Sequence, residues 1–372
     1  MSDGRGGPRA GVWAGRLTLV VPGLPQTLAG RWTSGPFVLA VWGGLAALVL
    51  LQPAGLVEAG VRGGWEERLA LLVLALSLAG AWGWSWWDVR TGVGSPPLLR
   101  RLARSPLAVV GGWGVATLVL LALLAPLLAP HDPTAQGSLT TERLLAPSAE
   151  HPLGTDMYAR DVLSRLLYGA RISLVIGVTA AAVSVGLGSV LGAVAGYLGG
   201  WVDSVVTRLV DVMLAFPRLV LLIALVALFE PSLLLLIAVL ALTHWPHATR
   251  LVRSEVLSLR ERPFVEAGQA LGFSRARILA GHILPNALVP ALVAGTLAVG
   301  DTIVLEAGLS FLGLGVEPPT PSWGAMVADG RAYLLEGWWL VTFPGVAVVV
   351  TVLAFNLAGD GLRNALDPRR EA

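Results

Sequence analysis

Two residue types are absent from the sequence, cysteine and lysine, and each absence excludes a class of chemistry. Without cysteine the chain forms no disulfide and holds no thiolate-bound metal. Without lysine it has neither the phosphate-binding lysine of a P-loop nor an amine for Schiff-base chemistry, since all 26 basic residues are arginine. An ordinary nucleotide-binding P-loop is therefore excluded.

Charge is also scarce. Charged residues make up 13% of the chain, whereas a soluble domain has about 25%. The deficit extends along most of the length, which excludes a soluble domain with one membrane anchor. The net charge of +2, with arginines scattered between apolar segments, gives no patch for nucleic acid. These features predict an all-α polytopic membrane protein.

The sequence does contain many long apolar segments. A membrane helix needs about 20 apolar residues, and eight segments approach or exceed that length, at approximately 37–57, 69–87, 106–129, 172–197, 205–229, 232–249, 286–309 and 338–358. Pro53 interrupts the first segment, so a re-entrant or interfacial helix is an alternative to a span there. The sequence thus predicts seven or eight spans.

The arginines indicate the orientation of these spans, because cytoplasmic connections are enriched in them. The N-terminus, residues 90–104, residues 250–282 and the C-terminal tail are rich in arginine, whereas residues 314–337 contain a single one. Eight spans with both termini cytoplasmic satisfy this distribution. Residues 130–170 are then an extracytoplasmic loop.

Four polar residues in or near the predicted spans are candidates for pore lining, because an ionisable group inside a membrane is costly and usually functional. They are Asp211, Arg218, Asp301 and Glu306. Asp301 and Glu306 are five residues apart and so do not share a helix face. For Glu306, a solvated position at the outer mouth is an equal alternative.

Segment 205–229 contains Arg208, Asp211 and Arg218. A span that began after Arg218 would have only 11 residues before Glu230, too few to cross, so one helix is expected to include all three charges. An ion pair near the cytoplasmic end, with arginine reaching the interface, is the alternative to pore lining.

Glycines are concentrated in two segments, 186–200 and 308–316. Small residues let membrane helices approach closely. We expect these glycines to mark helix packing first and moving parts only second.

The segment from 251 to 290 is too charged to span a membrane and too apolar for a flexible linker. Pro263 suits the first position of a helix that ends at Gly272, and Ser274 can cap a second helix that runs to Pro285. The first helix presents a small apolar surface that could dock into a groove of a partner. This surface comprises Phe264, Val265, Ala267, Gly268 and Leu271.

The residues "EAGQALG" followed by "HILPN" resemble the EAA loop of binding-protein-dependent ABC permeases. The residues that match are Glu266, Ala267, Gly272, Leu284 and Pro285; Gly268 stands where the family usually has alanine. In that family the loop is the coupling helix, which fits a cleft of the ATP-binding subunit. The resemblance therefore implies that these residues couple the chain to such a subunit.

Other segments narrow the resemblance to the C-type permease of dipeptide, oligopeptide and nickel importers. They include "RSPLAVVG", "HPLGTDMYARDVLSRLLYGARISL", "EAGLSFLGLGVEPPTPSWGAM" and "FNLAGDGLRNALDPR", in order over about residues 97–372. The resemblance implies the type I ABC importer fold, a six-helix core formed by spans three to eight. The expected domains are an N-terminal extension (1–95) with two probable membrane helices and a permease domain (96–372), which includes the outer loop (130–170) and the coupling loop (251–285).

The resemblance also implies partners: a second, B-type permease subunit, two ATP-binding subunits and an extracytoplasmic solute-binding protein, all arranged about a cell-membrane protein in contact with lipid. ATP and Mg²⁺ would be bound by the partner subunits, and this chain is expected to bind no cofactor or metal, to have no catalytic residue and not to be an enzyme. The sequence leaves the solute open among peptides, nickel and oligosaccharides.

Two other classes of protein compete with this interpretation. An ion-coupled secondary transporter could use the acidic residues of the spans, but no internal repeat is visible. A membrane-bound enzyme could use His131, His151, Asp132 and Asp156, or His244 with His247. The first set lies in a loop and has no metal-ligand spacing, and the second pair flanks Pro246 at a helix end, so solvated loop and interface histidines are expected.

Overall fold

The computed structural model describes residues 64–91, 102, 105–230 and 232–366, with the side chains of 80–91 left out. This part of the chain consists of helices and loops, and its only strand-like feature is an isolated bridge between Thr155 and Asp161. The first predicted span, 37–57, lies outside the described residues. The prediction of an all-α protein is confirmed.

Five helical stretches of the described part are long and apolar enough to cross a membrane. They are α7 (Pro106–Leu123), α9 (Val162–Leu198), α12 (Leu233–Leu259), the stretch Arg275–Phe311 that ends with α15 (Leu284–Phe311), and α17 (Trp339–Leu366). A sixth is obtained if α10 (Gly200–Ala215) and α11 (Arg218–Ala227) form one broken span. These six correspond to predicted spans three to eight.

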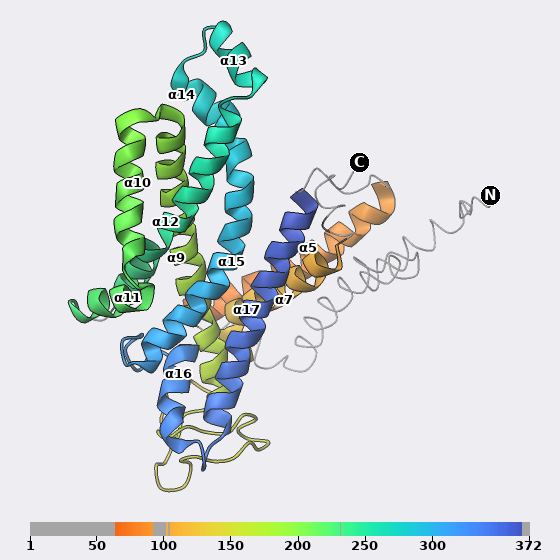
Figure 1. Cartoon of the computed structure of the whole chain (residues 1–372). Coiled ribbons are helices and arrows are strands. Elements are labelled where there is room, and N and C mark those ends of the chain that lie inside the picture. Colours follow the sequence, from red (N-terminus) through yellow and green to blue (C-terminus); the bar gives the residue numbers. More distant parts are fainter. Residues whose placement is uncertain (1–63, 92–101, 103–104, 231, 367–372) are drawn as a thin grey trace.

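The expectation of one helix through Arg208, Asp211 and Arg218 is wrong. The helix breaks at Phe216 and Pro217, and α11 turns away from α10 by 87° (Figure 1). Proline lacks a backbone N–H and disfavours a helical residue before it, so the chain ends one helix and starts another there. Arg208 and Asp211 therefore lie on α10, whereas Arg218 begins α11.

The centre of the fold is the long contact between α9 and α12, and glycines make it possible. Gly188, Gly192 and Gly196 follow one face of α9 against α12. A Cβ atom at Gly192 would lie 2.5 Å from the carbonyl oxygen of Thr249, closer than any real contact. The prediction that the 186–200 glycines serve packing is confirmed for these three, whereas a Cβ at Gly186 or Gly200 would meet no atom within 4 Å. By contrast, Gly313 has a φ of +81° and serves a turn after α15.

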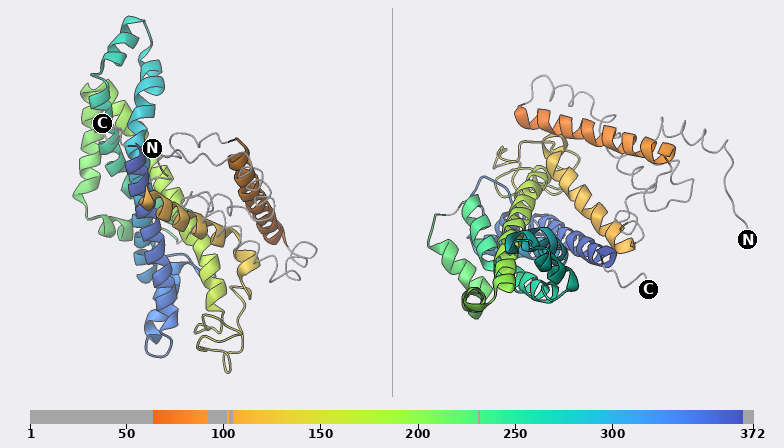
Figure 2. Two further views of the ribbon diagram at one scale, coloured as in Figure 1. Left: turned by 90° about the vertical axis from the view of Figure 1, so that its right-hand side faces the viewer. Right: turned by 90° about the horizontal axis from the view of Figure 1, so that it is seen from above.

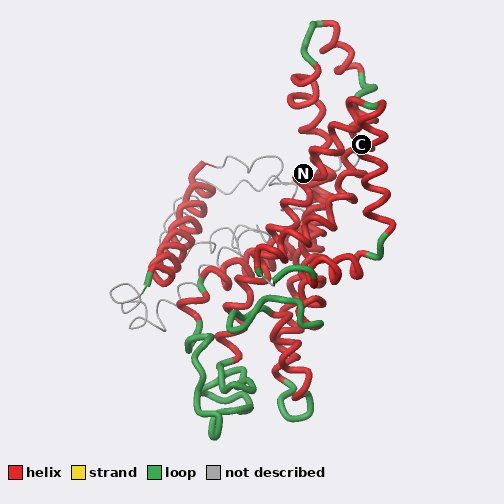
Figure 3. The backbone as a smooth tube through the Cα atoms, turned by 90° about the vertical axis from the view of Figure 1, so that its left-hand side faces the viewer, coloured by secondary structure: helices red, strands yellow, loops and turns green. Residues whose placement is uncertain are grey.

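The two ends of the bundle carry different elements (Figures 1 and 3). One end carries α13 (Pro263–Ala270) and α14 (Arg275–Ile278), which a π-helical turn (Leu279–Ile283) joins to α15. The other end carries the 129–161 loop, which follows α8 (Ala125–Leu128), together with α16 (Trp323–Gly330) and a 3₁₀ turn (Arg331–Tyr333).

Helix α5 (Trp65–Thr91) contains the second predicted apolar segment and lies beside the bundle (Figure 2). Its Ala70 and Leu74 pack against two leucines of the bundle. Leu124 lies between α7 and α8, and Leu127 lies within α8. Glu66 also forms an ion pair of 2.6 Å with Arg171 on α9. The end of the expected extension therefore contacts the permease domain directly.

Candidate coupling helix and charge cluster

Helix α13 is a short, sharply bounded helix at one tip of the molecule (Figure 1). Pro263 occupies its first turn, as predicted. At its other end Gly272 has a φ of +76°, and the N–H of Phe273 donates to the carbonyl of Gly268 at 3.0 Å. In this arrangement, which depends on glycine, backbone N–H groups just after the helix bond to its last carbonyls and so end the helix. The predicted ends of the helix are thus confirmed.

Ser274 caps the next helix, as the sequence predicted, because its hydroxyl accepts a hydrogen bond from the N–H of Arg277. From there α14, the π-helical turn and α15 run on as one helical stretch to Phe311. Leu284 and Pro285 stand at the start of α15. A force on the tip is therefore applied to a helix that crosses the whole bundle.

Fewer residues of α13 are exposed for docking than the sequence predicts. Val265 and Gly268 are buried against the chain itself, where a Cβ at Gly268 would lie 3.6 Å from Ile278 and Phe273. The prediction that both belong to an outward docking surface is wrong, because a small residue suits internal packing equally well. Their position instead anchors the helix.

The exposed residues of α13 and its end include Phe264, Glu266, Ala267 and Leu271. Leu271 is 73% exposed, although it is a large apolar residue. Glu266 lies in the first turn, where a negative charge favours the helix dipole, and it has no ion pair with any residue that the structure describes. The expected docking helix thus presents two large apolar side chains, Phe264 and Leu271, together with one acid.

A buried cluster fixes α13 to the bundle. Val265 and Ile278 from the tip pack together with buried residues of three long helices. These residues are Ala193 of α9, Val252 and Val256 of α12, and Ala287 and Ala291 of α15. Because such interiors are close-packed and resist compression, displacement of α13 must move these helices with it.

Arg218, His244 and Asp301 form a charge cluster from three helices. The Arg218 guanidinium donates to the Asp301 carboxylate at 2.7 Å and also bonds the His244 ring. Nε2 of His244 lies 3.4 Å from the same carboxylate. Sequence reasoning singled out Arg218 and Asp301 but assigned His244 to a solvated interface. Asp301 is exposed, so the cluster lies on a surface that no other part of the described chain covers.

Glu306 has the opposite environment, because its side chain is fully buried. Oε1 accepts hydrogen bonds from the hydroxyls of Ser310 (2.8 Å) and Ser322 (3.0 Å). Ser322 also caps α16. The alternative of a solvated acid at the outer mouth is wrong. Glu306 joins α15 to the start of α16 and does not line an open surface.

Asp211 belongs to neither group. It pairs with Arg250 of α12 at 2.6 Å, and both side chains are exposed. The alternative of an ion pair within segment 205–229 is therefore wrong for Asp211, whose partner is on another helix. An exposed ion pair of this kind contributes little to stability.

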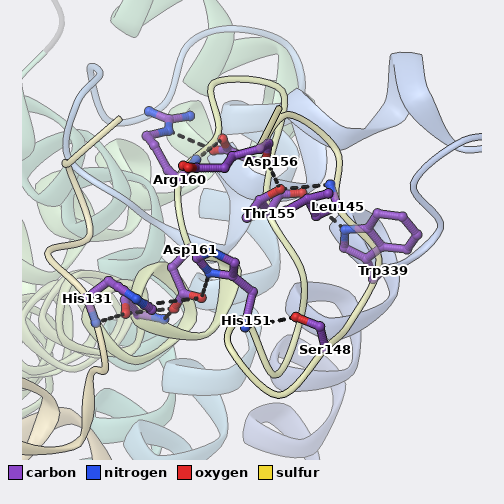
Figure 4. Close-up of polar contacts among 11 residues, drawn as sticks. His131, Leu145, Ser148, His151, Thr155, Asp156, Arg160, Asp161 and Trp339 are labelled. Carbon is purple, nitrogen blue, oxygen red and sulfur yellow. Dashed lines mark hydrogen bonds and ion pairs between the residues drawn. The ribbon is translucent and has the colours of Figure 1, made fainter. Parts of the chain in front are cut away.

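The 129–161 loop at the opposite end is folded onto the helices through Thr155 and Asp156 (Figure 4). Nε1 of Trp339 donates to the carbonyl of Thr155 at 3.2 Å, and Arg160 donates to Asp156 at 2.7 Å. Asp329 of α16 lies beside Arg160, and burial raises the pKa of its carboxyl in spite of the neighbouring arginines. The outer loop is thus a packed structure.

Comparisons with known proteins agree with these features. The family model of the binding-protein-dependent transport system inner membrane component matches residues 188–372, and that of the N-terminal TM domain of oligopeptide transport permease C matches residues 98–147. A dipeptide transport system permease protein of Alkalihalophilus pseudofirmus is 43% identical over 73% of this chain and 89% of its own length.

Two further relatives show the same extent of similarity. A probable D,D-dipeptide transport system permease protein of Escherichia coli is 41% identical, over 73% of this chain and 91% of that protein. A dipeptide transport system permease protein of Bacillus subtilis is 41% identical, over 73% of this chain and 84% of that protein.

Proposed function

The chain belongs to the family of binding-protein-dependent transport system inner membrane components, and on that premise we propose that it forms half of the pore of an ATP-driven peptide importer. It is a multi-pass protein of the cell membrane. The peptide class follows the names of its relatives, which are permeases for dipeptides or peptides. Nickel and oligosaccharides find no such support.

Three kinds of partner complete the proposed transporter. A B-type permease subunit supplies the other half of the pore, and two ATP-binding subunits, which hold ATP and Mg²⁺, attach at the α13 end. A solute-binding protein delivers peptide at the opposite end. The absence of lysine supports this division, since the phosphate-binding lysine must then be on another chain.

One observation carries the proposed mechanism, namely the fixed attachment of α13 to the helices of the pore. Its exposed face, with Phe264 and Leu271, docks into the ATP-binding subunit, whereas Val265 packs into the cluster shared with α9, α12 and α15. Closure of the ATP-binding subunits then moves α13 together with these helices. Transport follows as a shift of population between an inward-open and an outward-open pore.

The charge cluster supplies the proposed polar lining of the pathway. A peptide with free termini carries one ammonium and one carboxylate group, and Asp301 and Arg218 offer one charge of each sign on an uncovered side of the chain. We assign this side to the interface with the second permease subunit. Asp301 then attracts the ammonium group while Arg218 attracts the carboxylate.

The test is reconstitution of the complete transporter in proteoliposomes, with peptide uptake and peptide-stimulated ATP hydrolysis measured together. Leu271→Glu places a charge on the exposed docking face and is expected to reduce both activities at least several-fold. Leu271→Met is the matched control, because it keeps an apolar side chain of similar size at the same exposed position. Equal activity of these two variants would refute the docking assignment.

A further inference from the structure

Three potential metal ligands come together in the 129–161 loop, although they are far apart in the sequence (Figure 4). His131 follows α8, His151 lies in the middle of the loop, and Asp161 caps α9. Nδ1 of His151 lies 3.0 Å from Oδ1 of Asp161, and Nδ1 of His131 lies 3.7 Å from the same oxygen. The two imidazole rings are 4.8 Å apart between centroids.

These separations suit one metal ion. Zinc binds histidine nitrogen and carboxylate oxygen at about 2.0–2.1 Å, so two ligands at a tetrahedral angle are separated by about 3.3 Å. The two nitrogen–oxygen distances lie on either side of that value, and all three ligand atoms lie within 4.8 Å of one another. Only small movements would bring them into coordination.

The carboxylate is held in place by its own partners. Oδ2 of Asp161 accepts hydrogen bonds from the N–H (2.8 Å) and the hydroxyl (2.7 Å) of Ser164. The same hydroxyl accepts a hydrogen bond from the N–H of His131 at 3.1 Å. Oδ1 is thereby left to face the two histidines. Outer partners of this kind orient ligands in metal sites.

His151 is positioned independently by a second serine. Its N–H donates to the hydroxyl of Ser148 at 3.1 Å, and the N–H of Ser148 donates to the carbonyl of His151 at 2.9 Å. Of the nearby acids, Asp156 is paired with Arg160, and Asp132 accepts hydrogen bonds from Thr134. The third ligand is therefore Asp161.

Burial leaves the cluster open on one side. The side chains of Asp161 and His151 are 1% and 12% exposed, whereas that of His131 is 40% exposed. A metal ion can thus enter from solvent past His131, and a water molecule can occupy the fourth position. The expectation of solvated loop histidines is wrong for His151.

We propose that His131, His151 and Asp161 bind a divalent transition metal ion, with Zn²⁺ as the reference ion. Each imidazole coordinates through Nδ1 and keeps its proton on Nε2, so the hydrogen bond from His151 to Asp161 is replaced by two metal–ligand bonds. Two neutral nitrogens and one carboxylate oxygen form a donor set that zinc prefers. The bound ion clamps the start and the middle of the loop to the first turn of α9.

Zinc binding to the purified full-length chain, in nanodiscs and with a histidine-free affinity tag, tests this site. Equilibrium dialysis followed by elemental analysis is expected to give one Zn²⁺ per chain. His131→Gln and His151→Gln should each weaken binding by about 100-fold or more, because loss of an outer partner alone costs about 10–100-fold. His282→Gln, at the other end of the bundle, is the matched control and should bind as wild type.

His131→Gln decides the outcome even if His151→Gln fails to fold, since the His131 side chain is partly exposed. A rise in melting temperature on addition of Zn²⁺, present in wild type and in His282→Gln but absent in His131→Gln, would support the site. No binding by wild type at micromolar Zn²⁺, or equal binding by His131→Gln, would overturn it. The cluster would then be a hydrogen-bonded cap of α9 alone.

Discussion

Arg218 at the start of α11 donates a hydrogen bond of 2.7 Å to the carboxylate of Asp301 on α15, which joins residues 83 positions apart. We predict that Asp301→Asn and Arg218→Gln each lower uptake of peptides with free termini. Peptides with acetylated and amidated termini should be affected less, because they lack the charges that these side chains attract. The measurement is uptake of both peptide forms into proteoliposomes.

A double-mutant cycle tests the pair itself. The two single variants and the double variant should show a coupling of about 1 kcal/mol in thermal stability, the upper range for a pair that is partly exposed. Asp211→Asn, which breaks the exposed pair with Arg250, is the control and should leave uptake unchanged. Normal uptake of free peptides by both single variants would exclude these residues from the pathway.

The second prediction concerns membrane topology, and the absence of cysteine makes it simple to test. A cysteine in place of Thr140, in the outer loop, should react with a membrane-impermeant maleimide in intact cells. A cysteine in place of Glu261, beside α13, should react only after the membrane is opened. Both positions are exposed in the structure, so burial does not explain a lack of labelling. Labelling of position 261 from outside would reverse the orientation.

The third prediction concerns the contact between α9 and α12. Gly192→Ala introduces a Cβ against the backbone of Thr249 and should destabilise the protein by about 1–3 kcal/mol, as overpacking does. Gly186→Ala is the matched control on the same helix, since its Cβ would meet open space. It should be neutral or stabilising by up to about 1 kcal/mol, because alanine favours a helix more than glycine does.

Thermal unfolding in nanodiscs, followed by tryptophan fluorescence, measures both glycine variants. Gly192→Ala is expected to melt below wild type and Gly186→Ala at or above it. Equal melting temperatures for the two variants would mean that α9 and α12 are not in the close contact that the structure shows.

The fourth prediction concerns the N-terminal extension. A chain that begins at residue 96 should keep most of its coupled transport, because the six candidate spans from α7 to α17 remain. Its melting temperature should fall, since Leu124 and Leu127 lose the cover of α5 and Arg171 loses Glu66. Glu66→Gln in the full chain isolates the ion pair and should cost at most about 1 kcal/mol.

Co-purification of the truncated chain with the other subunits checks whether the extension is peripheral. Assembly and uptake close to those of the full chain are expected. Loss of assembly would place the extension within the pore-forming unit and contradict the proposed domain division.

Sequence reasoning located the spans and the ends of α13 because their causes are local. Lipid requires long apolar helices, and Pro263, Gly272 and Ser274 each act on the backbone next to them. It failed at Gly268 because a small residue is equally suited to a docking surface and to a packed interior. Which of the two applies depends on where Ile278 lies in space.

The same limit applies to the polar clusters. His131 and His151 are separated by 19 residues of irregular loop, so no periodicity indicates that Asp161 brings them together. Pro217 by itself indicates a break, because proline disfavours a continuous helix. The length that a span requires favours one continuous helix instead, and this argument puts Arg218 on the wrong helix.

The last prediction concerns coupling through α13. Gly268→Ala should be tolerated, because its Cβ would lie 3.6 Å from Ile278 and Phe273, an ordinary contact. Gly268→Trp cannot fit between α13 and α14 and should tilt the exposed face away from the ATP-binding subunit. Peptide-stimulated ATP hydrolysis is expected to fall several-fold in Gly268→Trp and to remain near normal in Gly268→Ala, with equal amounts of both proteins in the membrane.

Glu266→Lys tests the exposed face without disturbing the interior. The change reverses a charge in the first turn of α13, at a cost of about 0.3–1 kcal/mol to the helix, and opposes any cation of the partner that Glu266 meets. Glu266→Gln removes the charge alone and should have the smaller effect. If α13 were only a solvated loop, ATP hydrolysis would be stimulated normally in Gly268→Trp and in Glu266→Lys alike. That result would refute the coupling role, because one variant displaces the helix from within and the other alters the face it presents.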